Sequence, residues 1–167
     1  AAKIGCSVAL YNHGGWFGEP DKQIAIVERL KGEGVSNVGI VYNLHHGHDH
    51  LDRFPALLTK MKPYLVSLNL NGMDPGGDKV GRKILPLGQG ALDLQLLRTI
   101  RDSGYRGPIG ILGPTMDDAE ERLKDNLDGL DWLVLQLSGK SAGPAPKPRT
   151  AVPPRPEKAV SAKPDPE

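Results

Sequence analysis

The stretch Asn37-Val-Gly-Ile-Val-Tyr-Asn-Leu-His-His-Gly-His-Asp-His50 decides how the rest of the chain is interpreted. It opens with Val38, Ile40 and Val41, which are apolar and β-branched and therefore favour a buried strand. It then becomes a polar loop that holds four of the chain's five histidines. A strand that ends in titratable, metal-capable side chains is typical of the sites of α/β proteins. We therefore expect a functional site here, to which other strand ends contribute.

The same succession of strand, loop and helix occurs four times between residues 4 and 137. Alternation of this kind indicates parallel strands joined by right-handed crossovers, with the loops that follow the strands gathered on one face. The expected strands are 4–11, 38–42, 64–70 and 108–112. The expected helices are 20–32, 51–62 with a start near Arg53, 91–102 and 118–126 after a cap at Thr115 or Asp117, followed by a second apolar segment at 130–137.

Four such units predict an α/β fold that equals the C-terminal half of a (β/α)8 TIM barrel, because a whole barrel needs about 250 residues. An open four-stranded sheet is the alternative. The loops after the strands are long and polar or glycine-rich, and the returns to the next strand are short, which favours the barrel. Residues 1–137 form this unit, and residues 138–167 form a Pro-, Ala- and Lys-rich linker or disordered tail that cannot bury a core.

Composition excludes several classes of function. Lys plus Arg (21) nearly balances Asp plus Glu (20), so no global basic field for nucleic acid exists. No apolar run approaches the roughly 20 residues of a membrane span. The single cysteine, Cys6, excludes an internal disulfide and is expected to be a small buried strand residue. The chain begins without Met, so we expect a fragment or a processed product, and its cellular compartment stays unknown.

The histidine loop has two interpretations. His45, His46, His48 and His50 are candidate ligands of a divalent metal, although the string falls one residue short of the H-x-H-x-D-H run of metallo-hydrolases. The favoured alternative is a solvated or sugar-contacting loop with one functional histidine. His13 also follows a strand, so His13 and His46 are the candidates for acid–base catalysis.

Asparagines occur repeatedly at the predicted strand ends, although asparagine is poor in strands. Turn formation explains this, and so does hydrogen bonding to a polyhydroxylated ligand, because an amide both donates and accepts. We favour the ligand because the sites would converge. Trp16 either stacks on a sugar ring or packs locally. Gly88-Gln-Gly90 precedes a helix and is a weak anion-binding candidate, while Lys79, Arg82 and Lys83 suggest a solvated face. The predicted substrate-binding residues are Asn12, Trp16, Asn43, Asn69, Asn71 and Gln89.

The pattern resembles the xylose-isomerase-like TIM-barrel superfamily, which includes sugar-phosphate isomerases and epimerases, from Ile4 to about Leu137. The segments that carry the resemblance are Val8 to His13, Val38 to His46, Leu68 to Asn71, and Leu87 to Asp93 followed by Gly104 to Pro108. The resemblance implies a divalent metal held at the strand ends and catalysis through an enediolate or a hydride shift. It also implies that His46 is retained while neutral residues replace the metal ligands, at Tyr11, Asn43, Asn69 and Leu112.

These observations lead to a functional hypothesis. We expect a sugar or sugar-phosphate isomerase- or epimerase-like protein that acts on or binds a carbohydrate, with its catalytic status open and the usual metal-binding carboxylates lost. The alternative is a non-catalytic carbohydrate-binding module of a larger multidomain protein. A nuclease like endonuclease IV fits poorly because it needs several metals. A half barrel exposes two sheet edges, so we also expect a missing N-terminal half or self-association.

Overall fold

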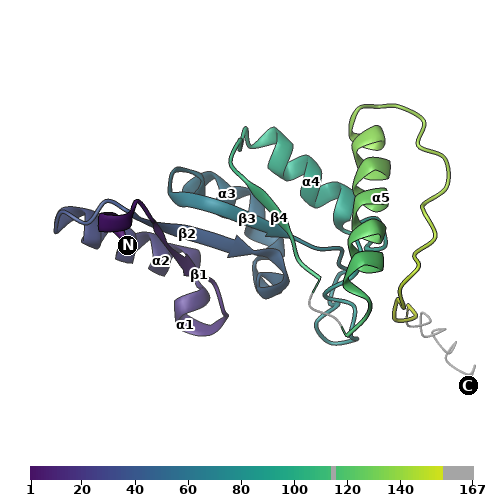
Figure 1. The fold of residues 1–167 in the computed structure, drawn as a ribbon, viewed down its shortest axis with the longest axis horizontal. Coiled ribbons are helices and arrows are strands. Elements are labelled where there is room, and N and C mark those ends of the chain that lie inside the picture. The colour runs from purple at the N-terminus through teal and green to yellow at the C-terminus, as the bar shows by residue number, and fades with distance from the viewer. Residues whose placement is uncertain (114–115, 156–167) are drawn as a thin grey trace, which may run out of the picture.

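A computed structural model describes residues 1–113 and 116–155 of the chain. Its centre is one four-stranded sheet in the order β1-β2-β3-β4, and every neighbouring pair is parallel (Figure 1). The strands are β1 (Val8–Tyr11), β2 (Val38–Asn43), β3 (Leu65–Leu70) and β4 (Ile109–Ile111). The prediction of four βα units in an α/β fold with parallel strands is therefore confirmed. All carboxyl ends of the strands lie on one edge.

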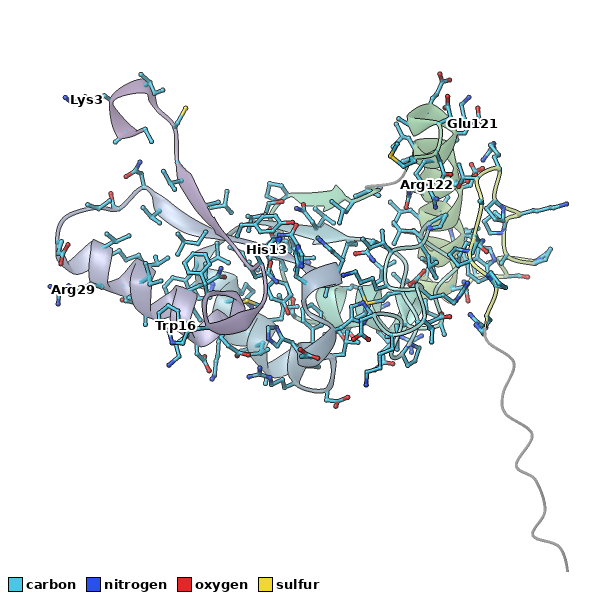
Figure 2. All side chains as sticks on the ribbon, turned by 90° about the horizontal axis from the view of Figure 1, so that it is seen from below. Lys3, His13, Trp16, Arg29, Glu121 and Arg122 are labelled. Carbon is cyan, nitrogen blue, oxygen red and sulfur yellow. The ribbon has the colours of Figure 1, made fainter. Side chains whose placement is uncertain are left out.

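The helices follow the strands in turn and pack on one face of the sheet (Figures 1 and 2). After the short α1 (Gly15–Gly18), they are α2 (Pro20–Gly32), α3 (Phe54–Met61), α4 (Asp93–Asp102) and α5 (Ala119–Leu137). Short 3-10 turns are η1 (Ala2–Ile4), η2 (Leu44–His46), η3 (His48–Arg53) and η4 (Lys62–Tyr64). Among the helices of the described residues, none has the length and apolar character needed to cross a membrane.

The hydrophobic core lies between the sheet and the helices. Ile40, Tyr42 and Leu68 project from the central strands and are 0% exposed. Leu58 and Met61 of α3 meet them from the helical layer and are equally buried. Each such side chain contributes roughly 1.5–3 kcal/mol by leaving water. The opposite face carries Tyr11, Asn43 and Asn69, so the core sits on one side of the sheet and the polar strand ends on the other.

Several local expectations were wrong. The first strand begins at Val8 rather than Ile4, because Gly5 turns the chain at φ 71° and leaves Ile4 78% exposed. Cys6 is consequently exposed rather than buried. The two apolar segments expected after residue 118 form one continuous 19-residue helix, α5, capped by Asp118, whose side chain accepts from the Glu121 N–H at 2.9 Å. The expected cap at Asp117 was therefore wrong by one residue, and the other candidate cap, Thr115, lies outside the described residues.

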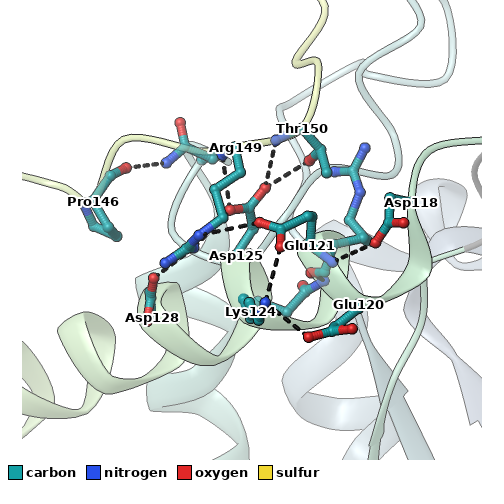
Figure 3. Close-up of polar contacts among 12 residues, drawn as sticks. Asp118, Glu120, Glu121, Lys124, Asp125, Asp128, Pro146, Arg149 and Thr150 are labelled. Carbon is teal, nitrogen blue, oxygen red and sulfur yellow. Dashed lines mark hydrogen bonds and ion pairs between the residues drawn. The ribbon is translucent and has the colours of Figure 1, made fainter.

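Residues 139–155, here called the strap, have no helix or strand and run back along α5 (Figure 1). They are extended, as their proline content indicates, but they are docked by polar contacts. Asp125 of α5 accepts hydrogen bonds from both backbone N–H groups and both side chains of Arg149 and Thr150, at 2.7–3.0 Å (Figure 3). The Gln89 side chain donates to the Pro146 carbonyl at 2.8 Å. The strap therefore joins α5 to the loop that follows β3.

Candidate functional site

Three asparagines at neighbouring strand ends are hydrogen-bonded in a row. The Asn12 carboxamide oxygen accepts from the Asn43 backbone N–H at 2.7 Å and from the Asn43 side chain at 3.1 Å. Asn43 in turn accepts from the Asn69 side chain at 2.6 Å. The row follows from the parallel register, which places Asn43 directly opposite Asn69. The convergence that the sequence predicted for these residues is therefore present in the structure.

Asn12 and Asn43 are 0% exposed, so their amides are used mainly by each other. This arrangement satisfies buried polar groups that would otherwise cost about 1–3 kcal/mol each. It also fixes the orientation of Asn69, which is only partly buried and lies at the accessible end of the row. Direct contact of these residues with a ligand stays a prediction, and the visible role of Asn12 and Asn43 is to position their neighbours.

The two candidate catalytic histidines lie side by side. The ring centroids of His13 and His46 are 4.5 Å apart, although the residues come from different strand-end loops. Tyr11 packs edge-on to His46 at 5.5 Å, and the ring of His45 lies 3.8 Å from that of His46. Figure 2 shows His13 close to the sheet. Four aromatic side chains, one from the end of β1 and three from the loops that follow β1 and β2, thus form one cluster, the imidazole cluster, made of Tyr11, His13, His45 and His46.

The electrostatic environment of the imidazole cluster favours neutral rings. Burial, together with the repulsion of positive charge at His46 and Lys83, lowers the pKa of His45 to about 4. Burial also lowers the pKa of His46, with His13 and Lys83 acting in the same direction. A neutral imidazole has a free lone pair, so His46 is able to accept a proton at neutral pH.

The remaining histidines of the loop are directed elsewhere. His50 bridges the Tyr42 hydroxyl at 2.9 Å and the Glu19 carboxylate at 3.2 Å, inside the helical layer. His48 lies 4.0 Å from the Asp78 carboxylate and lines a cavity between α3 and α4. Within residues 1–113 and 116–155, no three His, Cys, Asp or Glu side chains are placed to hold a metal ion. The four histidines of the loop do not meet at one point.

The other predicted ligand-binding residues lie around the cluster at different distances from it. Asn71 donates to the Lys83 carbonyl at 2.6 Å, and its own carboxamide oxygen is buried without a partner. Gln89 is directed to the strap. Trp16 is 65% exposed, with the Lys22 ammonium 5.7 Å from its ring, and stands apart from His13 (Figure 2). Of these three, Asn71 is joined to the loop that carries Lys83.

The weak anion-site expectation for Gly88-Gln-Gly90 was wrong, because the chain supplies its own carboxylate there. The Asp93 side chain accepts from the N–H groups of Gly88 at 2.8 Å, Gly90 at 3.0 Å and Met73 at 2.9 Å. Asp93 is 2% exposed, and its position three residues after Gly90 lets it close the loop. The backbone groups that would hold an anion are therefore occupied.

A cavity of about 500 Å³ lies between η3, α3 and α4, on the helical side of the sheet. Its wall mixes His48, Asp52 and Gln95 with apolar residues such as Phe54 and Leu96. No row of hydrogen-bonded polar groups leads into it. We place the candidate site at the strand ends instead, because unpartnered and pKa-shifted groups converge there.

Sequence reasoning missed three contributors to this region, namely Tyr11, His45 and Lys83. Tyr11 is the last residue of β1 and precedes the predicted Asn12 and His13, so its strand-end position was a usable signal. His45 was considered only as a metal ligand. Nothing in the local sequence distinguishes Lys83 from Lys79, since only the folded loop brings Lys83 towards the histidines.

Within the described residues the fold defines a mixed α/β protein with four parallel strands, and comparison with known proteins adds a likeness to a solved structure. No family model matches the chain, and no curated protein matches it either. The structure is similar to the apo form of the 3-keto-D-glucoside 4-epimerase YcjR of E. coli, with a TM-score of 0.54 and 20% sequence identity. The match covers 80% of this chain and 48% of that chain, so the chain spans about half the length of this neighbour.

The resemblance to the xylose-isomerase-like superfamily is therefore corrected. No family model matches the sequence, and within the described residues the four parallel strands form one sheet that is not evidently the half barrel of that superfamily. One of the segments that carried the resemblance, Leu87 to Asp93, is a glycine loop closed by the carboxylate of Asp93. Asp93 holds its glycine loop closed, which needs no family membership.

The divalent metal that this resemblance implied does not fit the residues present. The strand-end positions hold Tyr11, Asn43, Asn69 and Leu112, which carry no negative charge, and Asn43 already donates to and accepts from its neighbours. A hard dication in a protein is usually held by several carboxylate oxygens. We therefore derive no step of the chemistry through a metal at these positions.

Proposed function

We propose that the chain acts on a carbohydrate at the carboxyl ends of β1, β2 and β3, as an isomerase or epimerase. The observation that carries the proposal is the His13–His46 pair, 4.5 Å apart, beside the ordered asparagine row. The structural likeness to a 3-keto-D-glucoside 4-epimerase supports the choice of ligand class. An asparagine that both donates and accepts suits vicinal hydroxyls, and Asn69 is the accessible member of the row.

Proton transfer next to a carbonyl is the reaction that this pair can perform. Removal of a proton from the carbon beside a sugar carbonyl gives an enediolate, with the proton on one imidazole. Return of a proton to the neighbouring carbon isomerises the sugar, and return to the opposite face of the same carbon epimerises it. We take His46 as the base, a choice that its lowered pKa supports, and His13, whose ring centroid lies 4.5 Å away, as the partner that supplies or relays a proton.

Solvent deuterium exchange tests the proposal. The full chain is incubated in D₂O with aldoses, ketoses and 3-keto-D-glucosides, and incorporation is followed by NMR. Exchange at a carbon adjacent to the carbonyl is expected, with a loss of about 10²- to 10⁴-fold in His46→Gln and in His13→Gln. His48→Gln is the matched control, because His48 lines the helical cavity instead. Absence of exchange with every substrate would exclude catalysis, and ligand-induced melting shifts without exchange would support a binding module.

A further inference from the structure

Helix α5 packs against the rest of the chain on two of its sides. On the first side Leu133 is 1% exposed and belongs to the hydrophobic core. On the second side Asp125 holds the strap, and the Trp132 indole N–H donates to the Gly143 carbonyl of the strap at 3.1 Å. Figure 1 accordingly shows α5 between the sheet and the strap. A third side of the helix faces solvent.

This third side carries a row of large apolar residues, here called the α5 stripe. The row consists of Leu123, Leu127, Leu130, Val134 and Leu137, at alternating steps of four and three residues. Such steps keep side chains on one face of a helix and are the spacing at which two helices pack along a seam. Leu130 and Leu137 are partly buried against the core, whereas Leu123, Leu127 and Val134 are 52%, 46% and 47% exposed. Single exposed apolar residues are ordinary, but a row along one helix indicates a contact surface.

The α5 stripe lies next to an edge of the sheet. Leu123 and Ile111, the last residue of β4, line the same small hollow of about 150 Å³. Among the described strands β4 pairs with β3 alone, so its other edge is open, and its first residue, Ile109, is 46% exposed. An open strand edge beside apolar side chains is a place where chains associate.

The charges beside the α5 stripe indicate what covers it. Lys124 and Asp131 are exposed and stand seven residues apart, about two turns, on the same flank of the stripe. Antiparallel packing of two copies of α5 about the middle of the stripe brings Lys124 of each copy opposite Asp131 of the other. Lys124 already contacts Glu120 and Glu121 of its own helix at 2.9 Å, and an ammonium has a third proton to donate. A second copy therefore complements the stripe in apolar character and in charge.

We propose that the α5 stripe is the interface of a homodimer in which the α5 helices of two copies pack antiparallel. The two-fold axis passes between Leu127 and Leu130, so that Leu127 of each copy faces Leu130 of the other, and Leu123 faces Val134 in the same way. The strap lies on another side of α5 and stays in place. This inference goes beyond the proposed function, and no residue of the strand-end site takes part in it.

Sedimentation equilibrium of the full chain tests the interface. The wild type should show a monomer–dimer equilibrium that depends on concentration in the micromolar range. Leu127→Glu should raise the Kd of the dimer by about tenfold or more, because it places a charge in the apolar seam. Val80→Glu is the matched control, since Val80 is 44% exposed but belongs to the loop after β3. Urea unfolding of dilute samples checks that each variant is folded.

An exchange of charges tests the orientation. Lys124→Glu and Asp131→Lys should each raise the Kd by about threefold or more, since like charges then meet across the seam, and the double variant should recover most of the affinity. Within one copy the two residues are too far apart along the helix to interact, so recovery requires contact between copies. A chain that stays monomeric would overturn the inference. So would unchanged dimerisation of Leu127→Glu, an equal loss in Val80→Glu, or a double variant as weak as the single ones.

Discussion

The side chain of Asn12 accepts two hydrogen bonds from Asn43, one from its backbone N–H at 2.7 Å and one from its carboxamide at 3.1 Å. Both residues are 0% exposed. The pair joins the end of β1 to the end of β2, where the candidate catalytic residues follow. The geometry of the candidate site therefore depends on a contact between two strands that are 31 residues apart in sequence.

Asn12→Ala should destabilise the fold by about 2–4 kcal/mol, because it leaves the Asn43 N–H and carboxamide unpaired in the interior. Urea unfolding measures this free energy. Asn37→Ala is the matched control: Asn37 makes one bond, to the Cys6 carbonyl, near the opposite end of the same two strands. Its cost should stay within about 1 kcal/mol. Equal costs at the two positions would contradict the role assigned to Asn12.

Asp93 should make the folded state less stable as the pH rises, whereas most carboxylates have the opposite effect. Burial raises its pKa from 3.8 to about 7, against the backbone N–H groups of Met73, Gly90 and Gly88, which lower it. The folded state then binds this proton more tightly than the unfolded state, so the contribution is full below pH 3.8 and is lost as the pH rises through about 7. Urea unfolding of the wild type and Asp93→Asn across this range should show the loss in the wild type alone. A wild type that gains stability relative to the variant would show that the three N–H groups keep the carboxylate ionised.

The strap should be released when Asp125 loses its charge. Asp125 receives four hydrogen bonds from Arg149 and Thr150, and its side chain is 1% exposed. Asp125→Asn should therefore expose the Arg149–Thr150 bond and raise its cleavage by trypsin about tenfold, since the open population controls proteolysis. Cleavage after Lys140 is the internal control. Asp128→Asn should have little effect, because Asp128 is a 48% exposed rim partner of Arg149.

Low pH should loosen the strap for the same reason. Although burial opposes it, hydrogen bonding to Arg149 and Thr150 lowers the pKa of Asp125 from 3.8 to about 2. The folded state therefore binds this proton less tightly, and the contribution present above pH 3.8 is lost as the pH falls through about 2. Hydrogen exchange of the Thr150 amide should accelerate over this range relative to the same measurement in Asp125→Asn. If the difference in Thr150 exchange rate between the wild type and Asp125→Asn did not change with pH, the contact would not persist in solution.

Gly129→Ala should destabilise the chain, although alanine is the better helix former by roughly 1 kcal/mol. An added Cβ would lie 1.7 Å from the Leu87 carbonyl oxygen, so α5 would have to move away from the loop before α4. We expect a cost of at least about 2 kcal/mol by thermal or urea unfolding. Gly32→Ala, with no atom within 4 Å of the added methyl, is the control and should be neutral or stabilising. Stabilisation at both positions would contradict the packing of α5.

The sequence by itself determined the order and direction of the elements. Apolar periodicity and the glycines and prolines between segments placed β2, α2 and the other main elements within a few residues, because these signals are local. It also brought His13 and His46 into one neighbourhood, since parallel strands put their carboxyl ends on the same edge. The continuity of α5 was missed, and the structure shows that Gly129, inside this helix, lets the Leu87 carbonyl approach closely.

The tertiary structure alone decided which polar groups the chain uses for itself. His50 is bound to Tyr42 and Glu19, and Asp93 fills the glycine loop that resembled an anion site. Partners separated by many residues are selected by how the loops pack, and no local pattern encodes that selection. Sequence therefore identified the edge of the sheet where chemistry is possible, and only the fold showed which side chains on it are available.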